Sequence, residues 1–467
     1  MLRFVMGFLL DPSISKKVQK MRSRVRWGAK AITAQAIDQT RLGIADGLAS
    51  SSAFSFLVIG DSGIGPQSFG HPQREVADYL TTQMDDCRFL LHMGDVVYRM
   101  GSPDQYPANF IEPYREWLVE GDRTDYRRLN FCKPFLAVPG NHDYYNLPFP
   151  YGLLVASLRP LREYFKVPIT QNVSLRGSAT GDTYARAFID YLQDRPQSQL
   201  ATHLAQHYTT ATETGRALTY EPGKFTRLPN RYYQFRYGNI DFFGLDSSTF
   251  NLPVEIDGAQ VLSAAQPWQD LPANLDWTQL FWLRDRLIAS HQNSAVRGRI
   301  VYLHHPPYVT EATKYDGTIC LSVRRHLRWV LDAVAARLDE NALPLADLVL
   351  SGHAHCFEYL RTMETHHGDR HLNWIIAGSS GARLRPQHAE TIISETAGVE
   401  QRVIAKSQLY IGRQGAGADT RWPYSFLRID VADDSDRLRL VIRPFITELH
   451  HDTWTRSEFA PLILSSI

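Results

Sequence analysis

The sequence predicts an α/β domain in which strands and helices form layers around a shared core. Between about residues 54 and 385, short runs rich in Val, Ile, Leu and Phe alternate with segments of helical period. With 44% hydrophobic and 21% charged residues, the 467-residue chain is apolar enough to bury one large core or two smaller ones. We therefore expect a folded, layered domain rather than a disordered chain.

Seven apolar runs are predicted to be buried strands, because each is short and ends at or near Gly, Asp, Asn or His. These runs are Phe54–Ile59, Phe89–Met93, Phe135–Val138, Ile240–Leu245, Ile300–Leu303, Leu348–Leu350 and Trp374–Ala377. Three segments have the apolar spacing of helices. They are residues 72–84 with Pro72 in the first turn, Asp276–Ile288 with Asp276 as the N-cap, and Ser322–Leu338 with Ser322 as the N-cap.

The remaining segments divide the chain into a main domain at about residues 51–450 and two ends. Residues 1–50 are expected to form a basic N-terminal extension and residues 451–467 a C-terminal tail. A long irregular insertion, rich in Pro, Gly, Thr and Arg, is expected at about residues 144–231. Phe426–Val431 and Leu438–Ile442 alternate in polarity around Asp433–Asp436, which predicts a C-terminal β-hairpin.

Charge and cysteine content limit the partners and the compartment. The formal net charge is +1, so we expect no stable binding of nucleic acid. The four cysteines have no short pairing spacings, which favours free thiols and a cytoplasmic location. Residues 13–31 mix basic and apolar side chains, so two interpretations stay open: a weak contact with a membrane surface, which would make the protein peripheral, or a helix with a solvated charged face.

Five short polar motifs follow or close the apolar runs. They are Gly60-Asp61-Ser62-Gly63, Gly94-Asp95-Val96-Val97-Tyr98, Gly140-Asn141-His142-Asp143, Val301-Tyr302-Leu303-His304 and Gly352-His353-Ala354-His355. Functional groups of open α/β sheets gather beyond the carboxyl ends of the strands, so these motifs are expected to converge on one site.

The side chains of these motifs are suited to binding two metal ions. Asp, Asn and Tyr supply hard oxygen ligands and His supplies borderline nitrogen. A mononuclear zinc site needs only three or four such groups, whereas a carboxylate bridging two ions about 3.5–4 Å apart requires more. The candidate ligands are Asp61, Asp95, Tyr98, Asn141, His304, His353 and His355. A pair of metal ions activates water and clamps the phosphoryl group, so the set predicts phosphoester hydrolysis.

The ordered set of motifs resembles the purple acid phosphatases of the calcineurin-like metallophosphoesterase superfamily, over roughly residues 54–385. The resemblance implies a layered β-sandwich core flanked by helices. It also implies that Asp61, Tyr98 and His355 hold a first metal, Fe(III), and that Asn141, His304 and His353 hold a second, Fe(II), Zn(II) or Mn(II), with Asp95 as the bridge. The superfamily usually has His two residues after the first Asp, where this chain has Gly63, and Tyr98 supplies a replacement oxygen ligand.

Three further residues are candidates for catalysis. Asn141 takes the metal position of its motif, so the neighbouring His142 is free to face the substrate as a general acid. Asp143 is expected to orient His142. By analogy with adjacent histidines in the family, His305 is expected to contact the substrate phosphate.

The predicted function is a metal-dependent hydrolase of the acid phosphatase kind, acting on phosphomonoesters of small molecules. A phosphodiesterase or pyrophosphatase for nucleotide-like substrates is the alternative within the same chemistry, because the motifs do not separate the two. A membrane-associated interaction protein with a metallophosphoesterase fold is the alternative of another class.

Overall fold

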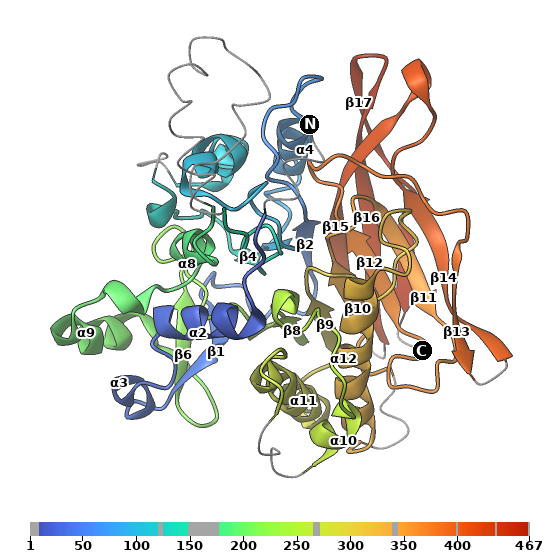
Figure 1. Ribbon diagram of the computed structural model, residues 1–467. Helices are drawn as coiled ribbons and strands as arrows, with labels where there is room; N and C mark the ends of the chain where they lie inside the picture. The colour runs from blue at the N-terminus through green and yellow to red at the C-terminus, as the bar shows by residue number, and fades with distance from the viewer. Residues whose placement is uncertain are drawn as a thin grey trace.

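The computed structural model of the chain describes residues 9–119, 125–147, 177–264, 271–338, 344–397, 400–434 and 437–465. Two β-sheets pack against each other at its centre, and helices cover the outside (Figure 1). This arrangement confirms the predicted layered α/β sandwich.

The larger sheet contains eleven strands among the described residues, in the order β13-β14-β11-β12-β10-β9-β8-β7-β1-β6-β5. Its middle strands, β8, β9, β10 and β12, run parallel to one another. The strands are β1 (Ile37–Ile44), β5 (Thr210–Ala211), β6 (Arg216–Tyr220), β7 (Tyr233–Tyr237), β8 (Ile240–Gly244), β9 (Gly298–Tyr302), β10 (Leu348–Ser351), β11 (Phe357–Thr362), β12 (Asn373–Ala377), β13 (Ile392–Ala397) and β14 (Glu400–Ile411).

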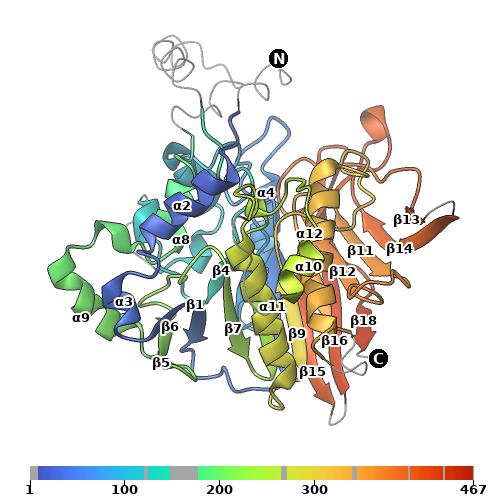
Figure 2. The same cartoon turned by 60° about the horizontal axis from the view of Figure 1, so that its bottom comes forward.

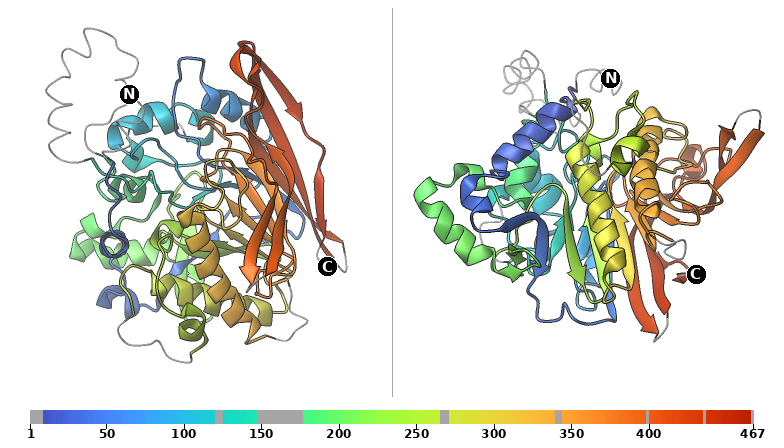
Figure 3. Two further views of the ribbon diagram at one scale, coloured as in Figure 1. Left: turned by 45° about the vertical axis from the view of Figure 1, so that its right-hand side comes forward. Right: turned by 90° about the horizontal axis from the view of Figure 1, so that it is seen from below.

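The second sheet has the order β17-β16-β15-β2-β3-β4, and β18 also pairs with β16. Its first three strands in the chain, β2, β3 and β4, are parallel. The long antiparallel strands β15 and β16 rise along one side of the molecule (Figure 3). The strands are β2 (Phe54–Ile59), β3 (Leu90–His92), β4 (Phe135–Ala137), β15 (Trp422–Asp434), β16 (Arg437–His450), β17 (Thr453–Glu458) and β18 (Leu462–Ser465).

Aromatic side chains fill the space between the two sheets. Phe56 of β2 stacks on Phe89 with the ring centroids 5.0 Å apart, and it meets Phe242 of β8 edge-on at 5.5 Å. All three side chains are fully buried. Such aromatic pairs contribute about 0.5–1.5 kcal/mol beyond the area they bury. The core therefore joins strands that are distant in the chain and fixes how the sheets face each other.

Helices cover the outer face of the larger sheet and flank its far edge. Helices α10 (Gly258–Ser263), α11 (Trp277–Gln292) and α12 (Thr318–Ala335) pack together on the outer face (Figure 2). Helix α4 (Pro72–Thr81) packs on β15 and β16. The others are α2 (Ile14–Arg24), α3 (Lys30–Thr33), α8 (Asp182–Phe188) and α9 (Gln197–His207).

All seven predicted strands and all three predicted helices are present; β2 has the predicted ends, and the other elements begin or end at different residues. Helix α12 begins at Thr318, so Ser322 is not its N-cap, and the Ser322 hydroxyl donates to the Thr318 carbonyl at 2.7 Å. Asp276 does precede α11, but its carboxylate pairs with the buried Arg231 instead of capping the helix. The Asp276 carboxylate turns to Arg231 because a buried guanidinium needs a negatively charged partner.

The predicted C-terminal hairpin is confirmed as β15 and β16, and its turn at residues 435–436 lies outside the described residues. Residues expected as a tail supply β17 and β18, and those expected as an N-terminal extension supply α2, α3 and β1. The described part of the expected insertion is not irregular, since it forms α8, α9, β5 and β6. Residues 148–176 of that insertion lie outside the described residues.

Helix α2 uses its apolar residues to pack on the protein. Ile14 and Met21 are buried, and so is Val25 directly after the helix. Two of its basic side chains also turn inward, since Lys17 donates to the Ser248 carbonyl at 3.2 Å and Arg24 to the Thr180 carbonyl at 2.8 Å. This packing removes the apolar face that an amphipathic membrane helix would need.

Across the part of the chain that the structure describes, no helix is long and apolar enough to cross a bilayer.

Candidate metal centre

The five predicted motifs meet where parallel strands of both sheets end. Asp61 and Asp95 follow β2 and β3 in one sheet, and His353 follows β10 in the other. These three residues have left-handed backbone conformations, with φ of 54°, 52° and 65°. Non-glycine residues rarely adopt such angles, and they cluster at functional sites where surrounding structure holds them.

One half of the site consists of Asp61, Tyr98 and His355. The Tyr98 hydroxyl donates to Oδ1 of Asp61 at 2.7 Å and lies 3.2 Å from Nε2 of His355. Nδ1 of His355 faces the Arg383 carbonyl at 3.1 Å, which leaves Nε2 turned toward Asp61 at 3.6 Å. Burial lowers the pKa of His355 to about 3, so its imidazole is neutral and can donate a lone pair to a metal.

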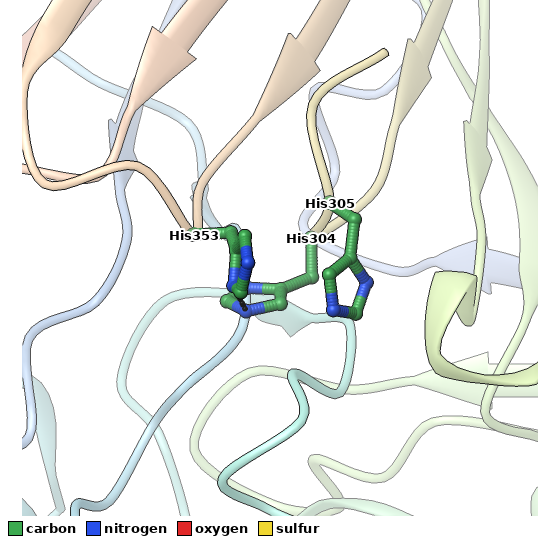
Figure 4. A group of neighbouring side chains, drawn as sticks. All are labelled: His304, His305 and His353. Atoms are coloured by element: carbon green, nitrogen blue, oxygen red, sulfur yellow. Dashed lines mark hydrogen bonds between the residues drawn. The ribbon is translucent and has the colours of Figure 1, made fainter. Parts of the chain in front are cut away.

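The other half consists of Asn141, His304 and His353, with Asp95 beside them. Nε2 of His304 lies 3.0 Å from Oδ1 of Asn141 and 3.4 Å from Oδ1 of Asp95. Nδ1 of His353 lies 3.3 Å from the same His304 nitrogen. Figure 4 shows His304, His305 and His353 coming from neighbouring strand ends into one region.

His304 shows why this arrangement fits a cation. Its Nδ1 is 2.8 Å from the Met93 carbonyl, and its Nε2 faces the oxygens of Asn141 and Asp95. Both ring nitrogens therefore meet acceptors, so a positive charge must sit at Nε2, as a proton or as a metal ion. Burial alone would lower the pKa of His304, but the nearby carboxylates outweigh it and raise the pKa to about 9.

The buried carboxylates of Asp61 and Asp95 also need a neighbouring positive charge if both are to be ionised. Burial raises the pKa of Asp61 to about 8. Burial also opposes ionisation of Asp95, but His304 and His142 outweigh it and lower the pKa of Asp95. The ligand atoms of Asp61, Asp95 and His304 all lie within 4.8 Å of one another. Two acidic side chains this close, with imidazole nitrogens around them, are the donors that a dinuclear centre needs.

Gly63 stands where no side chain fits. A Cβ atom there would lie 1.9 Å from the Val96 carbonyl oxygen. The Tyr98 amide donates to the Gly63 carbonyl at 2.8 Å, so the loop of Tyr98 lies directly against this glycine. The usual histidine is therefore excluded by packing, and the tyrosine phenol occupies this side of the site.

His142 lies beside the predicted ligands with its ring between two tyrosines. Its ring centroid is 4.4 Å from that of Tyr98 and 4.9 Å from that of Tyr145. Nδ1 donates to the Arg99 carbonyl at 2.6 Å, while Nε2 is 3.9 Å from Oδ2 of Asp95. The side chain is 16% exposed. Nε2 is thus the nitrogen left to interact with a bound molecule.

Asp143 does not orient His142, which corrects the expectation from sequence. Its Oδ2 accepts from the amides of Gly140 at 2.9 Å and Val96 at 3.3 Å. The carboxylate therefore ties together the two loops that carry Asp95 and Asn141. The Arg99 carbonyl takes the orienting role because it reaches Nδ1 of His142, whereas the Asp143 side chain is held by backbone amides.

His305 is fully buried behind His304 and His353. Its Nδ1 lies 2.8 Å from the Ser247 hydroxyl, and its ring centroid is 4.5 Å from that of His353. Nε2 of His305 is buried without a hydrogen-bond partner among the described residues. Its backbone amide also donates to Ser247, which fixes the position of the ring.

Lys314 is a site residue that the sequence does not reveal. Its ammonium group donates to Nε2 of His353 at 2.8 Å. It belongs to the connection between β9 and α12, where no motif or strand end marks it. The lysine brings a positive charge to a site that also holds two carboxylates, and a phosphate ester is an anion of the matching kind.

Comparisons with known proteins identify the family. A model described as calcineurin-like phosphoesterase matches residues 54–357, which is more than half of the chain. No curated protein matches. Among solved structures, GAP50, the anchor in the inner membrane complex of Plasmodium, has 13% identity and a TM-score of 0.41, over 85% of this chain and 84% of that one.

Two further structures are similar in fold. Purple acid phosphatase PPD1 from yellow lupin (Lupinus luteus) seeds has 12% identity and a TM-score of 0.44, over 89% of this chain and 54% of that one. This chain therefore spans about half the length of the lupin enzyme. PhoD has 11% identity and a TM-score of 0.44, over 88% of this chain and 69% of that one. The family match, together with the fold and the five motifs, shows that the chain belongs to the calcineurin-like phosphoesterase family.

Proposed function

We propose that this chain is a dinuclear-metal phosphoesterase of the acid phosphatase kind, hydrolysing phosphomonoesters of small molecules. The observation that carries the proposal is the environment of His304. Both of its nitrogens face oxygen acceptors inside a buried cluster that also contains Asp61 and Asp95. A buried set of this composition needs cations to be stable, and two metal ions satisfy it.

In this proposal Asp61, Tyr98 and His355 hold Fe(III), and Asn141, His304 and His353 hold Fe(II), Zn(II) or Mn(II), with Asp95 shared. When bound, the two ions supply Lewis acidity and lower the pKa of a water molecule toward neutrality. The phenol of Tyr98 favours a trivalent ion because a phenolate is a hard anionic ligand.

His142 donates the proton that the leaving group needs. Because Nδ1 of His142 is hydrogen-bonded to the Arg99 carbonyl, Nε2 is free to carry this proton. Burial lowers the pKa of His142, against the opposing charge of Asp95, which makes its protonated form a stronger acid.

In this proposal the buried His305 and the half-buried Lys314 bind the phosphate of the substrate. Nε2 of His305 lacks a partner among the described residues, and Lys314 reaches the same region through His353. A hydrogen bond from an ammonium to a phosphate contributes about 1.5–3 kcal/mol. Lys314→Met is therefore expected to lower kcat/KM for a monoester by about 10- to 100-fold. Lys406 is an exposed lysine on β14, so Lys406→Met is the matched control and should leave kcat/KM unchanged.

The test of the proposal is metal analysis of the purified chain together with turnover of 4-nitrophenyl phosphate and of bis(4-nitrophenyl) phosphate. Two equivalents of metal and a preference for the monoester are expected. A preference for the diester would favour the phosphodiesterase or pyrophosphatase alternative. Stoichiometric metal without turnover of either ester would contradict hydrolysis and favour an interaction protein with this fold.

The proposal includes a cytoplasmic location, which the four free thiols support. A peripheral contact with a membrane through residues 13–31 would have to be electrostatic, through exposed side chains such as Lys16 and Lys20, because the apolar side of α2 is buried.

A further inference from the structure

A second group of metal-binding side chains lies where the turn between β16 and β17 meets the loop between β14 and β15. It consists of Asp419, His450 and His451, which we name the hairpin-tip site. Nε2 of His450 and Nε2 of His451 each lie 3.5 Å from Oδ1 of Asp419. The three ligand atoms are all within 4.8 Å of one another. We propose that these residues bind one zinc-type divalent cation, separate from the dinuclear centre.

The distances favour a shared ion over hydrogen bonds. An imidazole that donates to a carboxylate brings nitrogen and oxygen to about 2.7–2.9 Å, well below the spacing observed here. Ligands of a tetrahedral zinc ion, bonded at about 2.0–2.2 Å, are about 3.3–3.5 Å apart by simple geometry. The observed 3.5 Å between each imidazole nitrogen and the Asp419 oxygen corresponds to the edge of such a tetrahedron.

His450 supplies an independent observation. Its Nε2 is buried and has no hydrogen-bond partner among the described residues, although it points toward Asp419. A buried ring nitrogen without a partner is destabilising, so such groups in folded proteins are normally satisfied by a ligand, an ion or water. A cation between His450 and Asp419 would satisfy both groups.

The backbone on both sides places these ligands. Gln414 and Arg421 exchange two backbone hydrogen bonds of 3.2 and 3.0 Å, which close the loop that carries Asp419. Gly415 allows this closure, because a Cβ there would lie 2.3 Å from the Asp419 carbonyl oxygen.

The turn between β16 and β17 has two non-glycine residues in left-handed conformation at its centre. His451 and Asp452 have φ of 46° and 58° at the two central positions, where tight hairpins prefer Asn-Gly. The reversal brings the rings of His450 and His451 to 3.9 Å between centroids, so that adjacent residues present nitrogen ligands to one point.

Two imidazoles and one carboxylate select the kind of ion. This set suits Zn(II), and also Co(II) as a probe, whereas Mg(II) and Ca(II) prefer an all-oxygen shell. Three protein ligands leave a fourth position open to water or another donor. Asp419 and His451 are 85% and 59% exposed, so an ion can enter from solvent. Binding would connect the β14–β15 loop to the end of the β16–β17 hairpin.

Zinc binding by the full-length protein, measured alongside hydrogen exchange, tests the inference. Native mass spectrometry should show that the wild type binds one more equivalent of Zn(II) than either His451→Ala or Asp419→Asn. Affinity at this site should fall by about tenfold or more in each variant, because even the loss of a group that only supports a ligand costs 10–100-fold. Amide exchange at residues 413–420 should slow on addition of Zn(II) in the wild type but not in these two variants.

The control is His371→Ala, which removes another exposed histidine that faces a single glutamate at 3.7 Å. It should keep the extra equivalent. Turnover of 4-nitrophenyl phosphate should be the same in all four proteins, which separates this site from the proposed catalytic centre. If Asp419→Asn bound zinc as the wild type does, the binding would be that of two adjacent histidines on a surface, and the site would be refuted. Equal stoichiometry in His451→Ala would refute it as well.

Discussion

Replacing His142 with Asn isolates the proposed proton transfer from the architecture of the site. The Asn side-chain amide lies the same number of bonds from the backbone as Nδ1 of His142, so it can keep the bond to the Arg99 carbonyl. The backbone amide of residue 142 donates to Oδ1 of Asp95 at 2.9 Å, and this bond does not depend on the side chain. The substitution should therefore leave Asp95 in place and remove only the group that carries the proton.

The expected loss depends on the leaving group. General acid catalysis contributes about 10²–10⁴-fold, or about 2.7–5.4 kcal/mol, when the departing alkoxide is strongly basic. Nitrophenolate is a weak base and needs little protonation, so its ester should lose far less. A plot of log kcat/KM against the pKa of the leaving group should consequently be steeper for His142→Asn than for the wild type.

The assay is a series of aryl and alkyl phosphates, measured beside metal content by plasma mass spectrometry. His371→Asn is the matched control, since His371 is an exposed histidine outside the site. The control should reproduce the wild-type slope, and His142→Asn should retain wild-type metal content. An equal loss on all esters would refute proton donation by His142, and loss of metal would make it a ligand or a structural residue.

Three other predictions concern the metals and a buried carboxyl. Asp95→Ala should lose both metals and fall to background activity, because the variant has no carboxylate to share between them; full metal occupancy by elemental analysis would contradict the two-metal assignment. Tyr98→Phe should lose the visible charge-transfer band expected of a phenolate on Fe(III), and an iron-loaded but colourless wild type would argue against Tyr98 as a ligand. Burial raises the pKa of Glu358 from 4.5 to about 7, so the folded state holds its proton more tightly than the unfolded state, and the free energy of unfolding should fall by up to about 3 kcal/mol as pH rises between these values. Glu358→Gln should remove that fall in urea unfolding at about pH 5 and about pH 8, whereas Glu364→Gln, an exposed control, should keep it.

The central strands can be predicted from the sequence because their own apolar residues indicate that they are buried. Parallel strands covered on both faces are nearly continuous apolar runs, as in β10 and, apart from Ser55, in β2. The polar residue that follows each run then marks the carboxyl end of the strand, where the site lies. This is why the candidate ligands can be identified before their positions in space are known.

The outer strands cannot be predicted in the same way, because each forms only by pairing with a neighbouring strand. β17 reads TWTRSE and is almost entirely exposed, so it carries no apolar alternation. It forms because β16 offers an unpaired edge, and its hydrogen bonds to that edge satisfy its backbone. β6, in the expected insertion, likewise depends on β1, which lies about 180 residues earlier in the chain.

Adjacency in sequence is a poor guide to contact between side chains, and the two pairs of neighbours in this chain show why. His142 and Asp143 were expected to work together, yet the His142 ring reaches the Arg99 carbonyl while the Asp143 carboxylate turns to the Gly140 amide. His450 and His451 carry no motif, yet their rings lie close together where β16 ends and the left-handed residues His451 and Asp452 reverse the chain. The backbone conformation decides which neighbours meet. A site built on strand ends is therefore readable from sequence, while one built on a turn becomes visible only when the path of the chain is known.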